Sequence, residues 1–466
     1  MTQIGTQANP LRVAIIGAGP TGFYTAEHLF KQQDYVVAVD MFERLPVPFG
    51  LVRYGVAPDH QKIKSVTAVY DRIAQNPAFR FFGNVEIGKH VTTPELRQYY
   101  HQIVYTTGAQ TDRRLNVPGE DLAGSLPATE FVAWYNGHPD YRDYEVDLSG
   151  DSAVVVGIGN VAMDVARILC RTPDELRQTD IADYALEALS ASRIKNVHIL
   201  GRRGPAQAAF TTPEIKELGE MADTEAVVLP DEAVLDPLSQ KALADSSDRA
   251  SLKKVEVIQS YANGQPSGKR RRLTVRFLVS PVALVGDENG RLSAIRIVKN
   301  ELYATESGSL RPRATEQFEE IPADLVFRAI GYRGIPIPGV PFYDSWGVIL
   351  NKEGRVLHLD TREPIVGEYT GGWIKRGPSG VIGTNKPDAL ETVKHMLEDV
   401  AAGKTLCPDQ PAPAAAAALV TARQPAYFTY EDWLRLDAME IARGKAEGRP
   451  RVKFTSVGDM LAALGR

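Results

Sequence analysis

The stretch Arg12-Val-Ala-Ile-Ile-Gly-Ala-Gly-Pro-Thr-Gly22 decides how the first part of this 466-residue chain folds. A short apolar run enters a GxGxxG loop, and residues 21–33 then have the spacing of a helix. Residues 36–42 are the predicted second strand, which delivers Glu43 at its end. Strand, loop, helix and strand in this order predict the opening βαβ unit of a dinucleotide-binding domain.

Each glycine of this loop has its own expected task. Gly17 makes the tight turn, Gly19 lets backbone amides approach a pyrophosphate, and Gly22 lets the helix pack closely on the strand. The N-terminus of the helix faces the phosphates. Because a carboxylate accepts hydrogen bonds from unmodified ribose hydroxyls, Glu43 predicts a tightly bound adenine dinucleotide here.

A second loop of this type, Gly157-Ile-Gly-Asn-Val-Ala162, is followed by a predicted helix over residues 160–170. After a long insertion, a strand over residues 196–200 leads into Gly-Arg202-Arg203-Gly. The interval exceeds the usual one, so spacing alone leaves open a structural turn with surface arginines. Paired guanidiniums between two glycines suit a ribose 2'-phosphate, which favours a phosphorylated nicotinamide dinucleotide.

Two further segments, residues 102–109 and 323–332, each combine a strand with a glycine turn. They predict the crossovers between two domains, of which the second is inserted into the first. The expected fold class is therefore α/β, with two Rossmann-like dinucleotide-binding domains of three layers each (ββα/βαβ). The expected bounds are 1–109 with 331–466 for the first domain, including a helical arm over about 426–466, and 110–330 for the second.

Smaller features complete this outline. Alternation of apolar and polar residues over 272–303 predicts a β-hairpin in the inserted domain, with its turn at 286–290. Residues 411–418 are rich in proline and alanine and predict a linker.

Composition excludes several classes of protein. With 53 lysines and arginines against 58 acidic residues the net charge is −5, so no general basic field indicates nucleic-acid binding. Cys170 and Cys407 are the only cysteines, which excludes a CxxC redox pair, a four-cysteine zinc site and a protein-ligated iron–sulfur cluster. Without an apolar signal core or a membrane-length apolar stretch, the expectation is a cytoplasmic protein that is not inserted in a membrane.

Four strings together resemble one family, the ferredoxin-NADP+ reductases of the adrenodoxin reductase type. They are residues 48–60 (PFGLVRYGVAPDH), 159–167 (GNVAMDVAR), 201–205 (GRRGP) with 210–214 (FTTPE), and 372–388 (GWIKRGPSGVIGTNKPD). The resemblance also accounts for the long interval after the second loop. It implies FAD at the first loop, NADPH at the second, and a ferredoxin as electron acceptor. Hydride would pass from NADPH to FAD and single electrons to a ferredoxin, which would serve cytochromes P450 or biosynthetic enzymes.

The predicted roles of His60 and Glu214 depend on whether the resemblance is taken into account. On sequence alone His60 is an exposed residue at the start of a helix over 59–75 that Asp59 would cap, and Glu214 is a first-turn acid favoured by the helix dipole. The resemblance places both beside the flavin and nicotinamide, as modulators of hydride transfer. We therefore predict His60 and Glu214 as the catalytic residues.

The resemblance also fixes the predicted cofactor contacts. Trp373 stands where many two-dinucleotide flavoproteins carry an aspartate, and the resemblance places it at the flavin. The predicted FAD residues are Gly17, Gly19, Pro20, Gly22, Glu43, Arg44, Gly50, Leu51, Gly108, Trp373, Gly380, Val381 and Ile382. The predicted NADP residues are Gly157, Gly159, Asn160, Val161, Arg202, Arg203, Glu214 and Gly380. No metal site is expected.

Because ferredoxins are acidic, the partner should dock on a local basic patch. The candidates are the run Lys269-Arg-Arg-Arg272 and the group Arg249, Lys253 and Lys254 on a predicted helix. Three alternative functions stay open at this point. They are an NADPH diaphorase, a flavin-dependent monooxygenase, and a non-catalytic FAD-binding subunit of a larger electron-transfer complex. A disulfide reductase would need a redox cysteine pair, and the spacing of Cys170 and Cys407 does not offer one.

Overall fold

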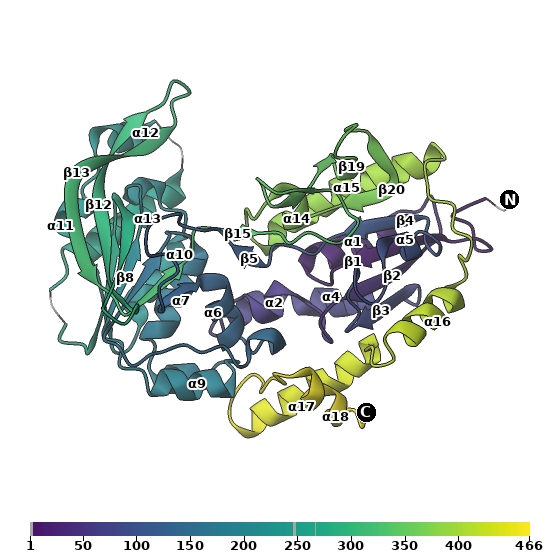
Figure 1. Ribbon diagram of the computed structural model, residues 1–466, viewed down its shortest axis with the longest axis horizontal. Helices are drawn as coiled ribbons and strands as arrows, with labels where there is room; N and C mark the ends of the chain where they lie inside the picture. The colour runs from purple at the N-terminus through teal and green to yellow at the C-terminus, as the bar shows by residue number, and fades with distance from the viewer. Residues whose placement is uncertain (1–2, 246–247, 266) are drawn as a thin grey trace. The chain divides into compact units, whose positions relative to one another are not determined.

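The computed structural model describes residues 3–245, 248–265 and 267–466 (Figure 1). The chain divides into two compact units, and each is described by itself. Unit 1 contains residues 1–56, 60–111 and 332–466, and unit 2 contains residues 57–59 and 112–331. No helix in the described part of the chain is long and apolar enough to cross a membrane.

Unit 1 is built on a seven-stranded sheet. Its order is β18 (Asn351–Lys352), β19 (Arg355–Leu357), β20 (Pro364–Thr370), β4 (Gln102–Tyr105), β1 (Leu11–Ile16), β2 (Val37–Glu43) and β3 (Phe79–Gly83). The last five strands are parallel, and β18 and β19 extend the edge in antiparallel fashion. β1 is buried on both faces, and from Val13 to Ile16 it is accordingly an apolar run without alternation, while its buried Arg12 pairs with Asp40 of β2.

Helices cover the sheet of unit 1 on the side where α1 (Pro20–Lys31) and α15 (Asn385–Ala401) pack together. The other helices of this unit are α2 (Leu51–Tyr54), α3 (Gln61–Lys64), α4 (Thr67–Ala74), α5 (Thr93–Leu96), α14 (Trp373–Arg376), α16 (Pro413–Arg423), α17 (Tyr430–Ala446) and α18 (Val457–Ala463). A small hairpin of β16 (Phe342–Tyr343) and β17 (Val348–Ile349) follows the second crossover. The short strands at the crossovers are β5 (Thr111–Asp112) and β15 (Tyr332–Arg333).

The C-terminal arm of unit 1 is anchored by a buried ion pair. Arg53 of α2 donates to both carboxylate oxygens of Glu440 of α17, over 2.9 and 2.5 Å. Trp433 of the same helix meets the ring of Phe49 edge-on, at 5.5 Å between centroids. The arm thus packs beneath the segment that carries Gly50 and Leu51.

Unit 2 contains a six-stranded parallel sheet. Its order is β6 (Ser125–Pro127), β14 (Leu325–Arg328), β7 (Ser152–Val156), β8 (Asn196–Leu200), β10 (Arg271–Arg276) and β9 (Thr224–Val228). One face carries helices, and the other carries an antiparallel sheet of β11 (Val279–Gly286), β12 (Leu292–Ala304) and β13 (Leu310–Pro322). This is the expected three-layer arrangement. The helices are α6 (Ala128–Tyr135), α7 (Asn160–Cys170), α8 (Pro173–Arg177), α9 (Asp183–Ser190), α10 (Thr212–Glu220), α11 (Pro230–Ala233), α12 (Pro237–Ala244) and α13 (Arg249–Ala262).

Three local predictions were wrong. Residues 411–418 are not a linker, because the alanine run favours helix and forms most of α16, with Pro413 in its first turn. The predicted hairpin over 272–303 begins only at β11, since β10 belongs to the parallel sheet. Asp59 does not cap a helix over 59–75: residues 61–74 form two short helices, and His60 occupies the N-cap position of α3.

Candidate cofactor sites

The first glycine loop has the steric requirements expected of a phosphate cradle. Gly17 has φ = 108°, and a Cβ there would lie 2.7 Å from the carbonyl oxygen of Thr106. A Cβ on Gly22 would lie 2.2 Å from the carbonyl oxygen of Gly17, so only glycine lets α1 approach this closely. At Gly19 a Cβ would meet no described atom within 4 Å, which leaves space against the backbone for a ligand. Tight turn, open approach and close packing are therefore at the three predicted positions.

The end of β2 supplies the acid beside this loop. Glu43 accepts hydrogen bonds from the backbone N–H of Ala18 through Oε2 (2.9 Å) and of Leu45 through Oε1 (3.1 Å). Burial raises the pKa of this carboxyl, although the backbone bonds and Arg44 act in the opposite direction. Hydroxyl donors would stabilise the charged form that burial disfavours. The acceptor oxygens of Glu43 and the open backbone at Gly19 thus fit the ribose and pyrophosphate of an adenine dinucleotide such as FAD.

Two segments distant in sequence close around the same loop. The Cβ position of Gly50 is 3.2 Å from Cα of Gly19, and the N–H of Phe49 donates to the carbonyl of Ala18 (2.8 Å). On another side, a Cβ on Gly372 would lie 2.2 Å from Oγ1 of Thr21. The structure therefore brings Gly50, Leu51 and the start of α14 to the first glycine loop.

Trp373 begins α14 and is held by its neighbours. Its indole N–H donates to the carbonyl of Ser379 (3.1 Å), and its ring stacks on Tyr332 at 5.6 Å between centroids. This bond ties Trp373 to the following loop, in which Gly380 has φ = 77° and the side chain of Val381 is 56% exposed. Ile382 begins a short 3-10 turn before α15. Gly108, with φ = 71° after β4, again leaves open space where a side chain would be.

The second glycine loop repeats the cradle in unit 2 with one difference. Gly157 has φ = 137°, and its Cβ position is 2.2 Å from the carbonyl oxygen of Ala329. Gly159 is open in the same way as Gly19, while the third position is the buried Ala162. Asn160 accepts from the N–H of Thr211 (3.0 Å), which joins the loop to the start of α10. Val161 follows in the first turn of α7.

The arginine pair after β8 is a cluster of like charge. Arg202 is exposed and Arg203 is half-buried, and burial, Arg202 and Arg311 of β13 all lower the pKa of Arg203. Within the described residues, none of these three arginines forms an ion pair with a carboxylate. The loop backbone is fixed, because Asn300 donates to the carbonyl of Arg202 (2.9 Å) and Leu278 N–H to that of Arg203 (3.1 Å). Such a cluster fits a dianionic group such as a ribose 2'-phosphate.

The predicted catalytic residues lie in different units. Glu214 is buried in the first turn of α10, and its Oε2 accepts from Nη1 of Arg167 over 3.1 Å within unit 2. His60 is half-buried in unit 1 and directly follows the segment 57–59, which belongs to unit 2.

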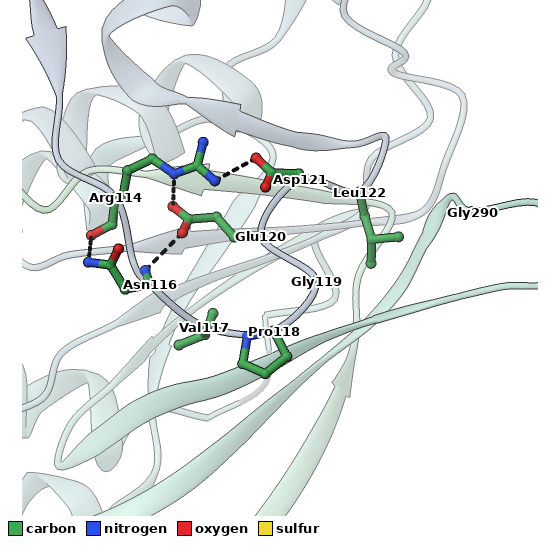
Figure 2. A pocket seen from close by; sticks show the side chains of 9 residues that line it. All are labelled: Arg114, Asn116, Val117, Pro118, Gly119, Glu120, Asp121, Leu122 and Gly290. Atoms are coloured by element: carbon green, nitrogen blue, oxygen red, sulfur yellow. Dashed lines mark hydrogen bonds and ion pairs between the residues drawn. The ribbon is translucent and has the colours of Figure 1, made fainter.

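A hollow of about 610 Å³ in unit 2 is not one of these sites. It is lined by residues 114 and 116–122 with Gly290 (Figure 2), and none of the predicted site residues is among them. Glu120 there accepts from the N–H groups of Leu115 and Asn116, at 2.6 and 2.8 Å, and lies 3.4 Å from Arg114. Its charge is therefore matched within the protein.

Comparisons with known proteins agree with this geometry. The family model "Pyridine nucleotide-disulphide oxidoreductase" matches residues 11–216. NADPH-ferredoxin reductase FprA of Mycobacterium tuberculosis is 46% identical over 460 residues, covering 97% of this chain and 98% of the relative. The human mitochondrial NADPH:adrenodoxin oxidoreductase is 40% identical, covering 99% and 93%. The structure of FprA in complex with NADPH matches with a TM-score of 0.91 and 44% identity, covering 98% of this chain and 100% of the other.

The chain belongs to the adrenodoxin-type NADPH-ferredoxin reductases. The predicted fold class, enzyme class and cofactors are thereby confirmed. The names of these relatives also support a ferredoxin-type partner.

The matching family is named after disulfide-reducing enzymes, but this NADPH-ferredoxin reductase has no reactive disulfide among its described residues. Both cysteines are free, and burial raises the pKa of Cys170 to about 12. A thiol with so high a pKa is a poor nucleophile at neutral pH. The disulfide-reductase alternative therefore has no support in Cys170, while Cys407 is a single exposed thiol.

The two predicted docking groups of this reductase are partly occupied by structural roles. Lys254 is buried and donates to the carbonyl of Ala208 over 2.5 Å, and burial lowers its pKa, so its inclusion in a surface patch was wrong. In the other group, Lys269 and Arg271 bond to backbone carbonyls and Arg270 pairs with Asp223. Arg249, Lys253 and Arg272 stay exposed.

Sequence reasoning gave no role to two residues that the structure brings to the candidate site residues. Arg167 is part of the motif over residues 159–167 but received no role, because two of its carboxylate partners, Asp59 and Glu214, are distant in sequence. Arg311 lies within an alternating strand rich in charge, where a single arginine gives no separate signal. Only the folded sheet of β12 and β13 brings it to the arginine pair.

Proposed function

We propose that this protein is an FAD enzyme that accepts hydride from NADPH and delivers single electrons to a ferredoxin. Bound FAD would supply the chemistry that couples two-electron and one-electron transfer. The observation that carries the proposal is the contrast at the two strand ends. Glu43 at the end of β2 bonds to the first glycine loop, whereas Arg202 and Arg203 after β8 have no carboxylate partner among the described residues.

The chain's own residues bind and orient. We propose that the first loop with Glu43, Arg44, Gly50, Leu51, Gly108, Trp373 and residues 380–382 holds FAD. The second loop with Arg202, Arg203 and Glu214 holds NADPH, and Gly380 contributes to both sites. Glu214 would accept a hydrogen bond from the nicotinamide carboxamide, and His60 with Glu214 would influence proton movement during hydride transfer.

The test is anaerobic reduction of the purified yellow protein by NADPH and, separately, by NADH. Addition of a ferredoxin and cytochrome c then reports single-electron delivery. We expect NADPH to bleach the flavin faster than NADH, and cytochrome c reduction to require the ferredoxin. A flavin that NADPH leaves oxidised would contradict the proposal.

We propose that the partner docks on α13. Arg249 and Lys253 are four residues apart and exposed on this helix, and Leu252 between them is 43% exposed. Two cations beside an apolar side chain suit an acidic protein partner. Reversal of both charges, Arg249→Glu with Lys253→Glu, should raise the KM for ferredoxin by about tenfold at low ionic strength and remove most of its salt dependence.

Arg272→Glu is the matched control, because it reverses an exposed charge of the other basic group. An equal or larger effect of Arg272→Glu would place docking there instead. NADPH-dependent flavin reduction should be unchanged in both variants.

The cytoplasmic location stays a prediction, which cell fractionation with an antibody to this protein would test.

A further inference from the structure

Arg167 is the most completely buried charged side chain near Glu214. It lies in the last turn of α7 with 0% exposure. Burial opposes its charge, but Asp164, Asp59 and Glu214 outweigh burial and raise its pKa well above the ordinary value. The guanidinium is therefore a permanent cation inside unit 2.

Two carboxylates anchor this guanidinium on one side. Asp59 accepts from Nε over 2.7 Å and from Nη2 over 3.0 Å, which is the paired geometry that fixes the plane of an arginine. Asp164, one turn earlier on α7, accepts from Nη2 over 2.6 Å. These bonds involve Nε and Nη2 of Arg167, so its third nitrogen, Nη1, can bond to a different carboxylate.

Nη1 is directed at α10. It donates to Oε2 of Glu214 over 3.1 Å and lies 3.5 Å from Oε2 of Glu217. The first of these carboxylates is buried, and the second is less so, with a side chain 31% exposed. Arg167 therefore connects the anchored end of α7 with the one acidic side chain of α10 that we assign to the nicotinamide.

Stability alone is a weak reason for this arrangement. Replacing a buried ion network by apolar side chains of similar size is often neutral or stabilising, because charges are costly to remove from water. A fixed guanidinium instead determines where a carboxylate oxygen lies, and catalytic groups depend on such fixing.

We propose that Arg167 is a positioning residue, which holds the carboxylate of Glu214 in the orientation used during NADPH oxidation. The inference rests on the proposed function, since it assigns Glu214 to the nicotinamide. Asp59 and Asp164 hold Arg167, and Arg167 holds Glu214.

The experiment is a double-mutant cycle measured by anaerobic stopped-flow reduction of the FAD-loaded protein. Four proteins are compared: wild type, Arg167→Gln, Glu214→Gln and the double variant. The measured quantity is the limiting rate of flavin reduction divided by the Kd for NADPH. We expect Arg167→Gln to lower this quantity by about 10- to 100-fold, as misplacement of an orienting group does.

The decisive result is the behaviour in the Glu214→Gln background. If Arg167 acts through Glu214, adding Arg167→Gln to the Glu214→Gln protein lowers the limiting rate divided by the Kd by less than about twofold. If the two residues act independently, the fold-losses of the two single variants multiply in the double variant. Multiplication of the two effects, or an unchanged rate in Arg167→Gln, would overturn the proposal. Because Arg167 is buried, Arg167→Lys serves in the same cycle if the glutamine variant does not fold.

Arg171→Gln is the matched control. Arg171 donates to Oδ2 of Asp59 over 2.7 Å and to Glu175 over 2.9 Å, from the C-cap position of the same helix. It shares Asp59 with Arg167 but has no contact with Glu214 among its described bonds. A loss in Arg171→Gln equal to that in Arg167→Gln would assign the effect to the network as a whole and refute the proposal.

Failure of this inference is separable from failure of the proposed function. Flavin reduction by NADPH in the wild-type protein tests the function, and the cycle tests Arg167. Bound flavin and the thermal unfolding midpoint of each variant show whether the fold is intact.

Discussion

The two glycine loops of this reductase differ at two points, and the differences separate what binds phosphate from what selects a cofactor. Both loops leave the second glycine open, and both turn at a glycine with positive φ. At the third position the first loop requires Gly22, while the second has Ala162. At the end of the next strand, the first loop has Glu43, whose carboxylate accepts from the backbone N–H groups of Ala18 and Leu45. The second loop has Arg202 and Arg203 after its next strand, and neither has a carboxylate partner among the described residues.

The common part is the backbone, which suits any pyrophosphate. The distinguishing part is a few side chains at the end of β2 or β8. Ligand choice should therefore change independently of phosphate binding, and each of the following substitutions tests that separation.

The largest effect should come from Arg202→Ala combined with Arg203→Ala. Each charged hydrogen bond to a phosphate contributes about 1.5–3 kcal/mol, so the preference for NADPH over NADH should fall by roughly 100-fold or more. The measurement is kcat/KM for each nucleotide. NADH turnover should survive, and unchanged discrimination would assign both arginines to the solvent surface.

Gly22→Ala should have the next largest effect. The new Cβ would lie 2.2 Å from the carbonyl oxygen of Gly17, so α1 must move away from the loop. Such overpacking costs about 1–3 kcal/mol, which corresponds to roughly 10- to 100-fold weaker FAD binding. Flavin absorbance after gel filtration measures the loss.

The reverse change at the second loop, Ala162→Gly, is the matched control. It should keep NADPH binding and cost only about 0.5–1 kcal/mol of helix stability. Full FAD occupancy in Gly22→Ala would show that the first loop has more freedom than its packing indicates.

Glu43→Gln should reveal a pH dependence. Burial raises the pKa of Glu43 above its ordinary value, and we propose that the ribose hydroxyls of FAD donate to its charged form. FAD affinity should therefore be complete above this raised pKa and fall as the pH drops through it, by about tenfold or more for one lost charged hydrogen bond. In Glu43→Gln that pH dependence should be absent. Fluorescence of released FAD between pH 4 and 8 would measure it, and equal profiles in both proteins would contradict this role.

Arg311→Met should have the smallest effect. As an exposed cation near Arg203, it should raise the KM for NADPH by only about two- to fivefold without changing NADH use. Arg313→Met is the matched control, because Arg313 lies two residues away on β13 and pairs with Glu301 over 2.5 Å. Equal changes in both variants would argue against a specific contribution of Arg311.

Local patterns predicted the loops well because each depends on neighbouring residues. Gly17, Gly19 and Gly22 reveal their tasks through spacing alone, and the helix over residues 160–170 and the strand over 196–200 agree with α7 and β8. The prediction of a linker over 411–418 was wrong, because it took the prolines as a sign of irregular structure. Alanine favours helix, and proline is tolerated in a first helical turn.

Side chains with distant partners could not be predicted in this way. Asp59 had the position of an N-cap, yet its carboxylate binds Arg167 and Arg171, more than a hundred residues later. Lys254 shared a helix with Arg249, but it points into unit 2 and bonds to Ala208. The burial and pairing of Asp59 and Lys254 depend on the tertiary fold, which cannot be predicted from helical spacing.

The discontinuous sheet of unit 1 has a consequence for synthesis of the protein. Its parallel strand β20 and the arm that carries Glu440 are translated after the whole of residues 112–331. On the ribosome, unit 2 is nearly complete while β4 still lacks its neighbour β20 and Arg53 its counter-ion. The nascent first strands therefore spend this interval with an open edge, which is the period when a chaperone or early FAD would protect them most.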